Sequence, residues 1–148
     1  MCVQTIPPVS AGPRPTVLFV DDEEALLQAI VRALRKEPLT ILTTSSPQEA
    51  LRVLTLRHVD IIISDEHMPG MSGTELLKRV RNQHPRTVRI LLTGGTGLDA
   101  NMRAIQEGEV YRFLSKPVPP EELSRTIAQA LHMGRLLRQR QDLTPRRR

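Results

Sequence analysis

The sequence predicts an α/β fold in which five parallel strands form one sheet and five helices cover its two faces. Short apolar segments rich in β-branched residues alternate with segments whose apolar residues recur at helical spacing. The short connections between these segments suit a parallel sheet built by helical crossovers. Residues 59–64 are apolar at nearly every position, as expected for a strand buried by helices on both sides.

The first two strands are predicted at residues 16–20 and 39–44. Between them, apolar residues repeat at the spacing of one helix face: Leu26, Leu27, Ile30, Val31 and Leu34. The second helix begins after Ser46, which we expect to cap it. Pro47 then occupies the first turn and Glu49 completes a capping box.

The second half of the chain continues the alternation. Strands are predicted at residues 59–64, 87–92 and 110–114. Each is followed by a helix, of which the one around residues 98–106 has the weakest pattern. Of the other two helices, the earlier one has Leu76, Leu77 and Val80 on its inward face. The last helix has Leu123, Ile127, Ala130 and Leu131 there.

Composition and charge divide the 148-residue chain into three parts. Residues 1–15 contain four prolines and no apolar periodicity, which predicts a disordered leader. Residues 134–148 contain six arginines and a single acid, Asp142. Subtracting these from the 21 basic and 16 acidic residues of the whole chain leaves 15 of each in residues 1–133. We therefore expect a neutral folded domain at residues 16–133 and a basic tail or linker start at 134–148.

Composition also bears on location and ligands. The single cysteine, Cys2, excludes an internal disulfide and a cysteine-rich metal site. Apart from His67, the chain has three histidines, whose spacing does not match that of a zinc site: His58, His84 and His132. Neither a membrane span nor a secretory signal is apparent, so a cytoplasmic location without membrane contact is expected.

Polar residues gather where the predicted strands end. Asp21 and Asp22 follow the first strand, Asp65 the third, Thr93 the fourth and Lys116 the fifth. Because parallel strands end at the same edge of a sheet, these side chains should meet there. Crowded carboxylates favour a bound cation, and Mg²⁺ prefers carboxylate and phosphate oxygens. A carboxylate is itself a nucleophile toward phosphorus, and Asp65 is the best placed to act as one.

Four segments carry a family resemblance: residues 17–23, 60–73, 92–94 and 113–117. Together they resemble the receiver domains of bacterial two-component response regulators, over about residues 16–133. The resemblance implies a flavodoxin-like, doubly wound sheet with strand order 2-1-3-4-5. It also implies a phosphorylation-dependent signalling module that accepts a phosphoryl group from a histidine kinase.

The resemblance assigns roles around the predicted phosphoacceptor, Asp65. Asp21, Asp22, Asp65 and the backbone carbonyl of His67 would hold Mg²⁺, directly or through water. Thr93 would hydrogen-bond the phosphoryl group.

Lys116, which would form a cis peptide bond with Pro117, would pair with the phosphoryl group. Thr93 and Phe113 would move together as the switch and change the face made by the fourth helix, fifth strand and fifth helix. Phe113 lacks the hydroxyl of the tyrosine that many members carry. His67 and Gly95 would tune the lifetime of the phosphoryl group, and the glycines that follow Thr93 predict a switch loop that orders on phosphorylation. Glu66 adds a negative charge that could simply face solvent.

The expected partners are a sensor histidine kinase or phosphotransfer protein and a downstream effector, with a second copy of the chain left open. The expected chemistry is Mg²⁺-dependent self-phosphorylation and self-dephosphorylation, without ordinary turnover. A haloacid-dehalogenase-like phosphatase is disfavoured because neither Asp21 nor Asp65 has a second aspartate two positions later.

Two alternatives concern output. Residues 107–117 resemble receivers joined to cyclic-dinucleotide phosphodiesterases of the HD-GYP type or found in hybrid kinases, so the chain could be the receiver of a larger regulator, with Leu136, Leu137 and Leu143 starting a linker helix. The fifteen residues after 133 are too few for a helix-turn-helix domain. Non-specific binding of the arginine tail to nucleic acid is the less favoured alternative.

Overall fold

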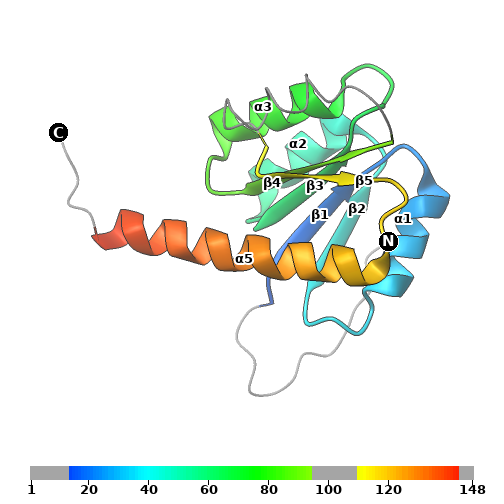
Figure 1. Cartoon of the computed structure of the whole chain (residues 1–148). Coiled ribbons are helices and arrows are strands. Elements are labelled where there is room, and N and C mark those ends of the chain that lie inside the picture. Colours follow the sequence, from blue (N-terminus) through cyan, green and yellow to red (C-terminus); the bar gives the residue numbers. More distant parts are fainter. Residues whose placement is uncertain (1–13, 95–109, 144–148) are drawn as a thin grey trace.

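A computed structural model describes residues 14–94 and 110–143 as a parallel sheet with helices on both faces (Figure 1). Its strands lie in the order β2-β1-β3-β4-β5, and every neighbouring pair is parallel. They are β1 (Thr16–Val20), β2 (Thr40–Thr44), β3 (Ile61–Asp65), β4 (Val88–Thr93) and β5 (Arg112–Ser115). The predicted fold class, strand number and strand order are confirmed.

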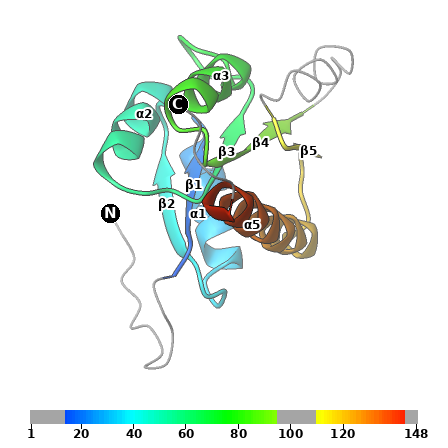
Figure 2. The same ribbon diagram turned by 90° about the vertical axis from the view of Figure 1, so that its left-hand side faces the viewer.

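Four of the five predicted helices lie in the described part of the chain. They are α1 (Glu24–Ala33), α2 (Pro47–Leu56), α3 (Gly73–Gln83) and α5 (Pro120–Leu143). The predicted helix at residues 98–106 falls outside the described residues. Helices α1 and α5 cover one face of the sheet and α2 and α3 cover the other (Figure 2).

The core has two halves because successive strand residues point to opposite faces. On β1, Val17 and Phe19 belong to the cluster under α1 and α5, whereas Leu18 and Val20 belong to the cluster under α2 and α3. All four are at most 1% exposed. The continuous apolar run of this strand is therefore explained by burial on both faces.

Serine caps fix the starts of the two helices on the α2–α3 face. The Oγ of Ser46 accepts a hydrogen bond from the backbone N–H of Glu49 at 3.2 Å, as predicted. Ser72 caps α3 in the same way, since its Oγ accepts from the N–H of Glu75 at 3.1 Å. These bonds satisfy backbone donors that the first helical turn leaves without partners.

Strand bounds shift by one or two residues from the prediction. Strands β3 and β4 run on to Asp65 and Thr93, because these residues still pair in register with Leu92 and Ser115. Strand β5 starts late: Val110 is buried ahead of it, but strand pairing begins only at Arg112. Hydrophobicity therefore marked the buried residues, whereas backbone pairing sets the ends of the strands.

Helix α5 continues well past residue 133, the predicted end of the folded domain, as far as Leu143. Gly134 is buried, and a Cβ built on it would lie 3.4 Å from Cγ2 of Val88 at the start of β4. One turn later, Nη1 of Arg138 lies 3.4 Å from Oδ1 of Asp60. The first turns of this extension therefore contact the sheet. No helix within the described ranges is both long and apolar enough to cross a membrane.

Asp60, just before β3, joins three parts of the chain. Its Oδ2 accepts a hydrogen bond from the N–H of Thr16 at 2.8 Å, and its Oδ1 lies 3.0 Å from Nε2 of His58. Burial raises the pKa of Asp60, but the hydrogen bonds from Thr16, His58 and Arg138 and the charge of His58 outweigh burial and lower this pKa. The carboxylate form therefore stabilises the fold.

Replacing Asp60 with asparagine should lower the free energy of unfolding by about 1 kcal/mol at neutral pH. A carboxyl whose pKa is lowered on folding stabilises the protein above its ordinary pKa, near pH 4, and loses this contribution as pH falls through the lower folded value. Urea unfolding at a series of pH values should therefore show the wild type and Asp60→Asn converging below about pH 4. Curves that stay parallel to pH 3 would contradict this assignment.

Candidate functional site

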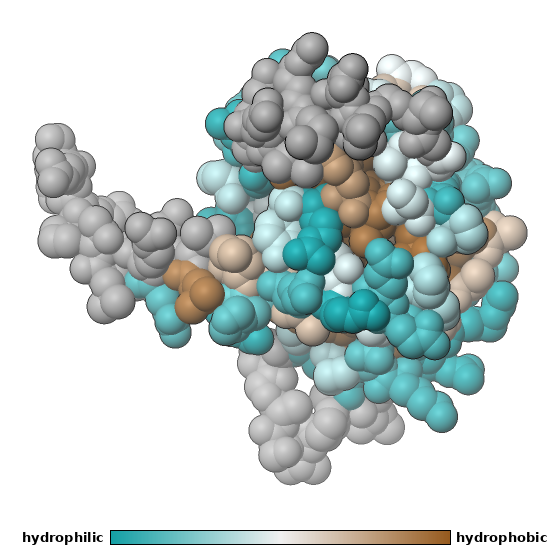
Figure 3. All heavy atoms as spheres, viewed as in Figure 1, coloured by the Kyte–Doolittle hydropathy of each residue, from teal (hydrophilic) through white to brown (hydrophobic). Residues whose placement is uncertain are grey.

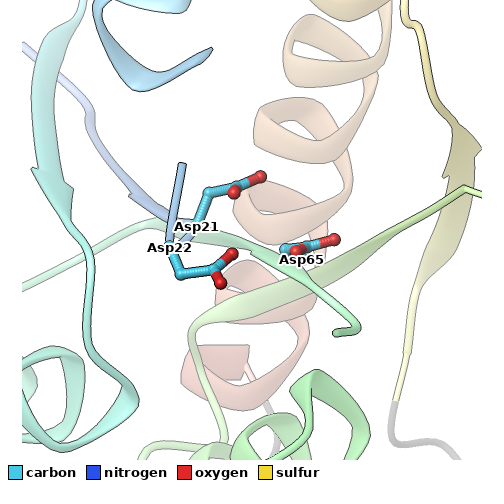
Figure 4. A group of neighbouring side chains, drawn as sticks. All are labelled: Asp21, Asp22 and Asp65. Carbon is cyan, nitrogen blue, oxygen red and sulfur yellow. The ribbon is translucent and has the colours of Figure 1, made fainter. Parts of the chain in front are cut away.

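The carboxyl ends of two adjacent strands bring the predicted acids together. Asp21 and Asp22 directly follow β1, and Asp65 is the last residue of β3, the strand that pairs with β1. Figure 4 shows the three side chains grouped at this edge. One carboxylate oxygen from each lies within 4.8 Å of those of the other two.

Lys116, directly after β5, reaches into this group. Its Nζ lies 2.9 Å from Oδ2 of Asp21 and 3.1 Å from Oδ1 of Asp65, and 3.8 Å from Oε1 of Glu23. Burial lowers the pKa of Lys116, but its hydrogen bonds to Asp21 and Asp65 and their charges outweigh burial and raise this pKa. Lys116 is therefore held as an ammonium ion between two carboxylates.

The charges of this group do not balance. The side chains of Asp21 and Asp65 are 1% and 7% exposed, whereas Asp22 is exposed. Three carboxylates face one close ammonium group, which leaves a charge of about −2 at the edge of the sheet. Buried carboxylates are costly without a cation, so the donor set fits a divalent ion.

Mg²⁺ suits the group because it takes one or two protein carboxylates together with water and phosphate oxygens. The residues that could hold it are Asp21, Asp22 and Asp65, two buried and one open to solvent. His67, whose carbonyl was also expected as a ligand, is an exposed residue in the loop after β3. Its part in a metal site stays a prediction.

Glu66 has a partner that the sequence did not reveal. Its Oε1 accepts hydrogen bonds from the backbone N–H and the Oγ1 of Thr74, both at 2.8 Å. The possibility that Glu66 simply faces solvent is therefore excluded, since its carboxylate binds the first turn of α3. A carboxylate there is also favoured by the helix dipole.

Gly73, the first residue of α3, packs against the backbone of Asp65. Its N–H donates to the carbonyl of Glu66 at 2.9 Å. A Cβ on Gly73 would lie only 2.2 Å from the backbone oxygen of Asp65 and 2.8 Å from Cδ1 of Leu91. The missing side chain of Gly73 therefore allows α3 to approach the backbone of Asp65.

The remaining predicted residues lie close by or outside the described part. Thr93 ends β4, is 5% exposed, and its carbonyl accepts a hydrogen bond from the N–H of Lys116 at 2.9 Å. Phe113 is half-buried against the α2–α3 cluster. The expected cis peptide bond between Lys116 and Pro117 is present. Gly95 and the rest of the predicted switch loop after Gly94 fall outside the described residues.

An apolar pocket of about 390 Å³ opens beside Lys116. Figure 3 shows hydrophobic surface on this side of the molecule, above α5. The pocket lies between α1, the end of β4 and the start of α5. It is lined by Glu23, Leu26, Ile30, Leu92, Gly94, Lys116, Pro117, Val118 and Leu123.

Comparison with known proteins gives a consistent result. The family model of the response regulator receiver domain matches residues 17–128. The hydrogenase transcriptional regulatory protein HoxA of Cupriavidus necator is 39% identical over 116 residues, which are 78% of this chain and 24% of that protein. The DNA-binding transcriptional regulator NtrC of Escherichia coli K12 is 34% identical over 118 residues, 80% of this chain and 25% of that protein. The chain thus spans about a quarter of the length of these relatives.

Solved structures agree over nearly the whole chain. The signal receiver domain of an HD domain-containing protein from Pseudomonas fluorescens Pf-5 is 40% identical, with a TM-score of 0.82, and the match covers 91% of this chain and 99% of that one. A response regulator receiver domain protein from Clostridium thermocellum is 35% identical, with a TM-score of 0.77, over 83% of this chain and 98% of that one.

Proposed function

Because this chain belongs to the family of response regulator receiver domains, we propose that it accepts a phosphoryl group on Asp65 and signals the change to an effector. One observation carries the proposal: the buried carboxylate of Asp65 lies 3.1 Å from the ammonium of Lys116 and beside two further carboxylates. This arrangement combines a nucleophile with a cation at the place where phosphoryl oxygens would develop charge.

In the proposed reaction, a carboxylate oxygen of Asp65 attacks the phosphorus of a phosphohistidine or of acetyl phosphate. The bond from phosphorus to the donor's nitrogen or oxygen breaks, and its electron pair leaves with the donor. Mg²⁺, held by Asp21, Asp22 and Asp65, would supply charge neutralisation for the phosphoryl oxygens. Lys116 would turn from Asp65 to a phosphoryl oxygen, and the hydroxyl of Thr93 would donate to another.

The second half of the proposed cycle is hydrolysis of the acyl phosphate. Water would attack the phosphorus of the acyl phosphate and release inorganic phosphate, which restores the carboxylate of Asp65. His67 and the undescribed Gly95 are the residues that we propose set how readily water reaches the phosphorus. The chain thus undergoes self-phosphorylation and self-dephosphorylation without steady turnover of a substrate.

The switch is proposed to pass through Thr93 and Phe113. Thr93 ends β4 and Phe113 lies in the neighbouring β5, half-buried at the edge of the core. Movement of Thr93 toward the phosphoryl group would leave space into which Phe113 rotates. The face that responds would include β5, α5 and the segment predicted as the fourth helix, residues 98–106.

The proposed donor is a histidine kinase or phosphotransfer protein in the cytoplasm. The apolar pocket beside Lys116 supports the docking of such a donor protein next to Asp65. Leu26 of α1 and Val118 line this pocket and are only partly buried, so they offer apolar surface to a partner. The receiver would then act on an effector protein or on an effector domain of a larger regulator. HoxA and NtrC are named as transcriptional regulators and are about four times as long as the matched segment of this chain. Their greater length and the continuation of α5 to Leu143 support the alternative that this receiver belongs to a larger regulator.

The test of this function is incubation with acetyl phosphate followed by measurement of the intact mass. The wild type should gain one phosphoryl group with Mg²⁺ and none with excess EDTA. A protein that gains nothing with Mg²⁺, or gains the same mass in EDTA, would contradict the proposal.

Asp22→Asn should raise the Mg²⁺ concentration needed for half-maximal phosphorylation by at least about tenfold, because it removes one of three charges that attract the ion. Asp22 is exposed and has no close contact with Lys116, so the fold should be unchanged. Glu24→Gln, which removes a nearby charge in the first turn of α1, is the matched control. Equal Mg²⁺ requirements for wild type and Asp22→Asn would exclude Asp22 as a metal ligand.

A further inference from the structure

A second pocket, of about 340 Å³, lies at the opposite end of the sheet from the acids. It is formed where α2 and α3 end and β3 and β4 begin, beside the extension of α5. Figure 2 views the molecule from this end, with the C-terminal half of α5 pointing toward the viewer. The lining residues are Leu54, Arg57, His58, Val59, His84, Pro85, Arg86, Thr87 and Arg138.

The pocket is cationic. Arg57, Arg86 and Arg138 come from three different parts of the chain, and no carboxylate lines the pocket with them. Arg138 is partly neutralised by Asp60, at 3.4 Å. Within residues 14–94 and 110–143, no ion pair joins Arg57 or Arg86 to an acid. Arg57 and Arg86 therefore line the pocket without an acid paired to them in these ranges, whereas Asp60 contacts both Arg138 and Nε2 of His58, the latter at 3.0 Å.

His84 adds a second, independent observation. Its Nε2 is buried and has no hydrogen-bond partner among the described residues. A buried polar atom without a partner costs free energy, so native proteins usually supply one. The apolar side chains of Leu54, Val59 and Pro85 offer no such partner. Because Nε2 has almost no accessible surface, a ligand oxygen would reach it only if the pocket wall opened around His84.

Helix dipoles account for only part of this charge. Arg57 and His84 directly follow α2 and α3, where cations are favoured by the helix C-terminus. That effect does not explain Arg138, which is the nineteenth residue of α5 and lies before its last turn, or the buried Nε2 of His84. Convergence of cations from separate elements on one pocket is what a binding site for anions requires.

We propose that this pocket binds a small molecule that carries phosphate groups. A guanidinium group matches the geometry of phosphate through paired N–H donors, and arginine is favoured for this reason at phosphate sites. The volume lies at the lower end of the range for small-molecule sites. Because Arg138 belongs to the extension of α5, a bound ligand would hold that extension against the start of the sheet.

Titration of the full chain with pyrophosphate, without Mg²⁺ and with nuclear magnetic resonance detection, tests the proposal. Saturable shifts should appear at His84, Arg86 and their neighbours. Arg57→Gln and Arg86→Gln should each weaken binding about tenfold, the loss expected for one charge-assisted hydrogen bond. Both side chains are exposed, and circular dichroism of each variant would verify that the fold is retained.

Two controls separate this site from other sources of binding. Arg52→Gln removes an exposed arginine of α2 that does not line the pocket, and it should leave the affinity unchanged. Asp65→Asn should also leave it unchanged, since the acids lie at the other end of the sheet. The proposal is overturned if no saturable shift appears, if Arg52→Gln weakens binding as much as Arg86→Gln, or if the shifts map to Lys116.

Discussion

Asp65→Asn is expected to abolish phosphorylation by acetyl phosphate, with a rate at least about a hundredfold below the wild type. The amide has the shape of the carboxylate but is a poor nucleophile, so the acyl phosphate cannot form. Lys116 keeps its 2.9 Å contact with Asp21, which should preserve the fold. Intact-mass measurement over time, at saturating Mg²⁺, gives the two rates directly.

Glu66→Gln is the matched control, because it converts the neighbouring carboxylate to an amide, as Asp65→Asn does at position 65. Glu66 binds the N–H and hydroxyl of Thr74, so its replacement should leave the rate of phosphorylation within about twofold of the wild type and cost only stability. Phosphorylation that survives in Asp65→Asn, or that is lost in Glu66→Gln, would mean that the nucleophile is misassigned.

Gly73→Ala is expected to lower the free energy of unfolding by about 3 kcal/mol or more. The new Cβ would lie 2.2 Å from the backbone oxygen of Asp65 and 2.8 Å from Leu91. Backbone on one side and the core on the other leave little room for relief, so α3 must shift away from β3. Chemical denaturation measures the loss, and slower phosphorylation at Asp65 should accompany it.

Gly134→Ala is the contrasting variant in the middle of α5. Its Cβ would lie 3.4 Å from Val88, an ordinary contact, and alanine favours a helix interior over glycine by roughly 0.5–1 kcal/mol. We therefore expect this variant to be as stable as the wild type or slightly more so. A Gly73→Ala protein as stable as Gly134→Ala would contradict the close approach of α3 to Asp65.

The site was predictable because it follows a rule of sheet topology. Asp21, Asp65, Thr93 and Lys116 lie far apart in sequence, yet each ends or follows a predicted parallel strand. Strands that run the same way bring their carboxyl ends to one edge. The period of the apolar residues was sufficient to predict the strands, and therefore this grouping, without any distance information.

Contacts that depend on side-chain packing could not be predicted in this way. The hydrogen bonds of Glu66 to Thr74 require the direction of the loop between β3 and α3, which no periodicity encodes. The role of Gly73 depends on the distance between a helix and a strand. The continuation of α5 past residue 133 was only an alternative in the sequence, because it depends on contacts such as the one between Arg138 and Asp60.

The most direct test is to locate the modified residue in the wild-type chain. After reaction with acetyl phosphate, borohydride reduces an acyl phosphate to the alcohol, so that the modified aspartate becomes homoserine and can be identified by peptide sequencing in a mass spectrometer. Homoserine is expected at position 65 only, and only when Mg²⁺ was present. Homoserine at position 21 or 22, or equal modification in EDTA, would contradict it.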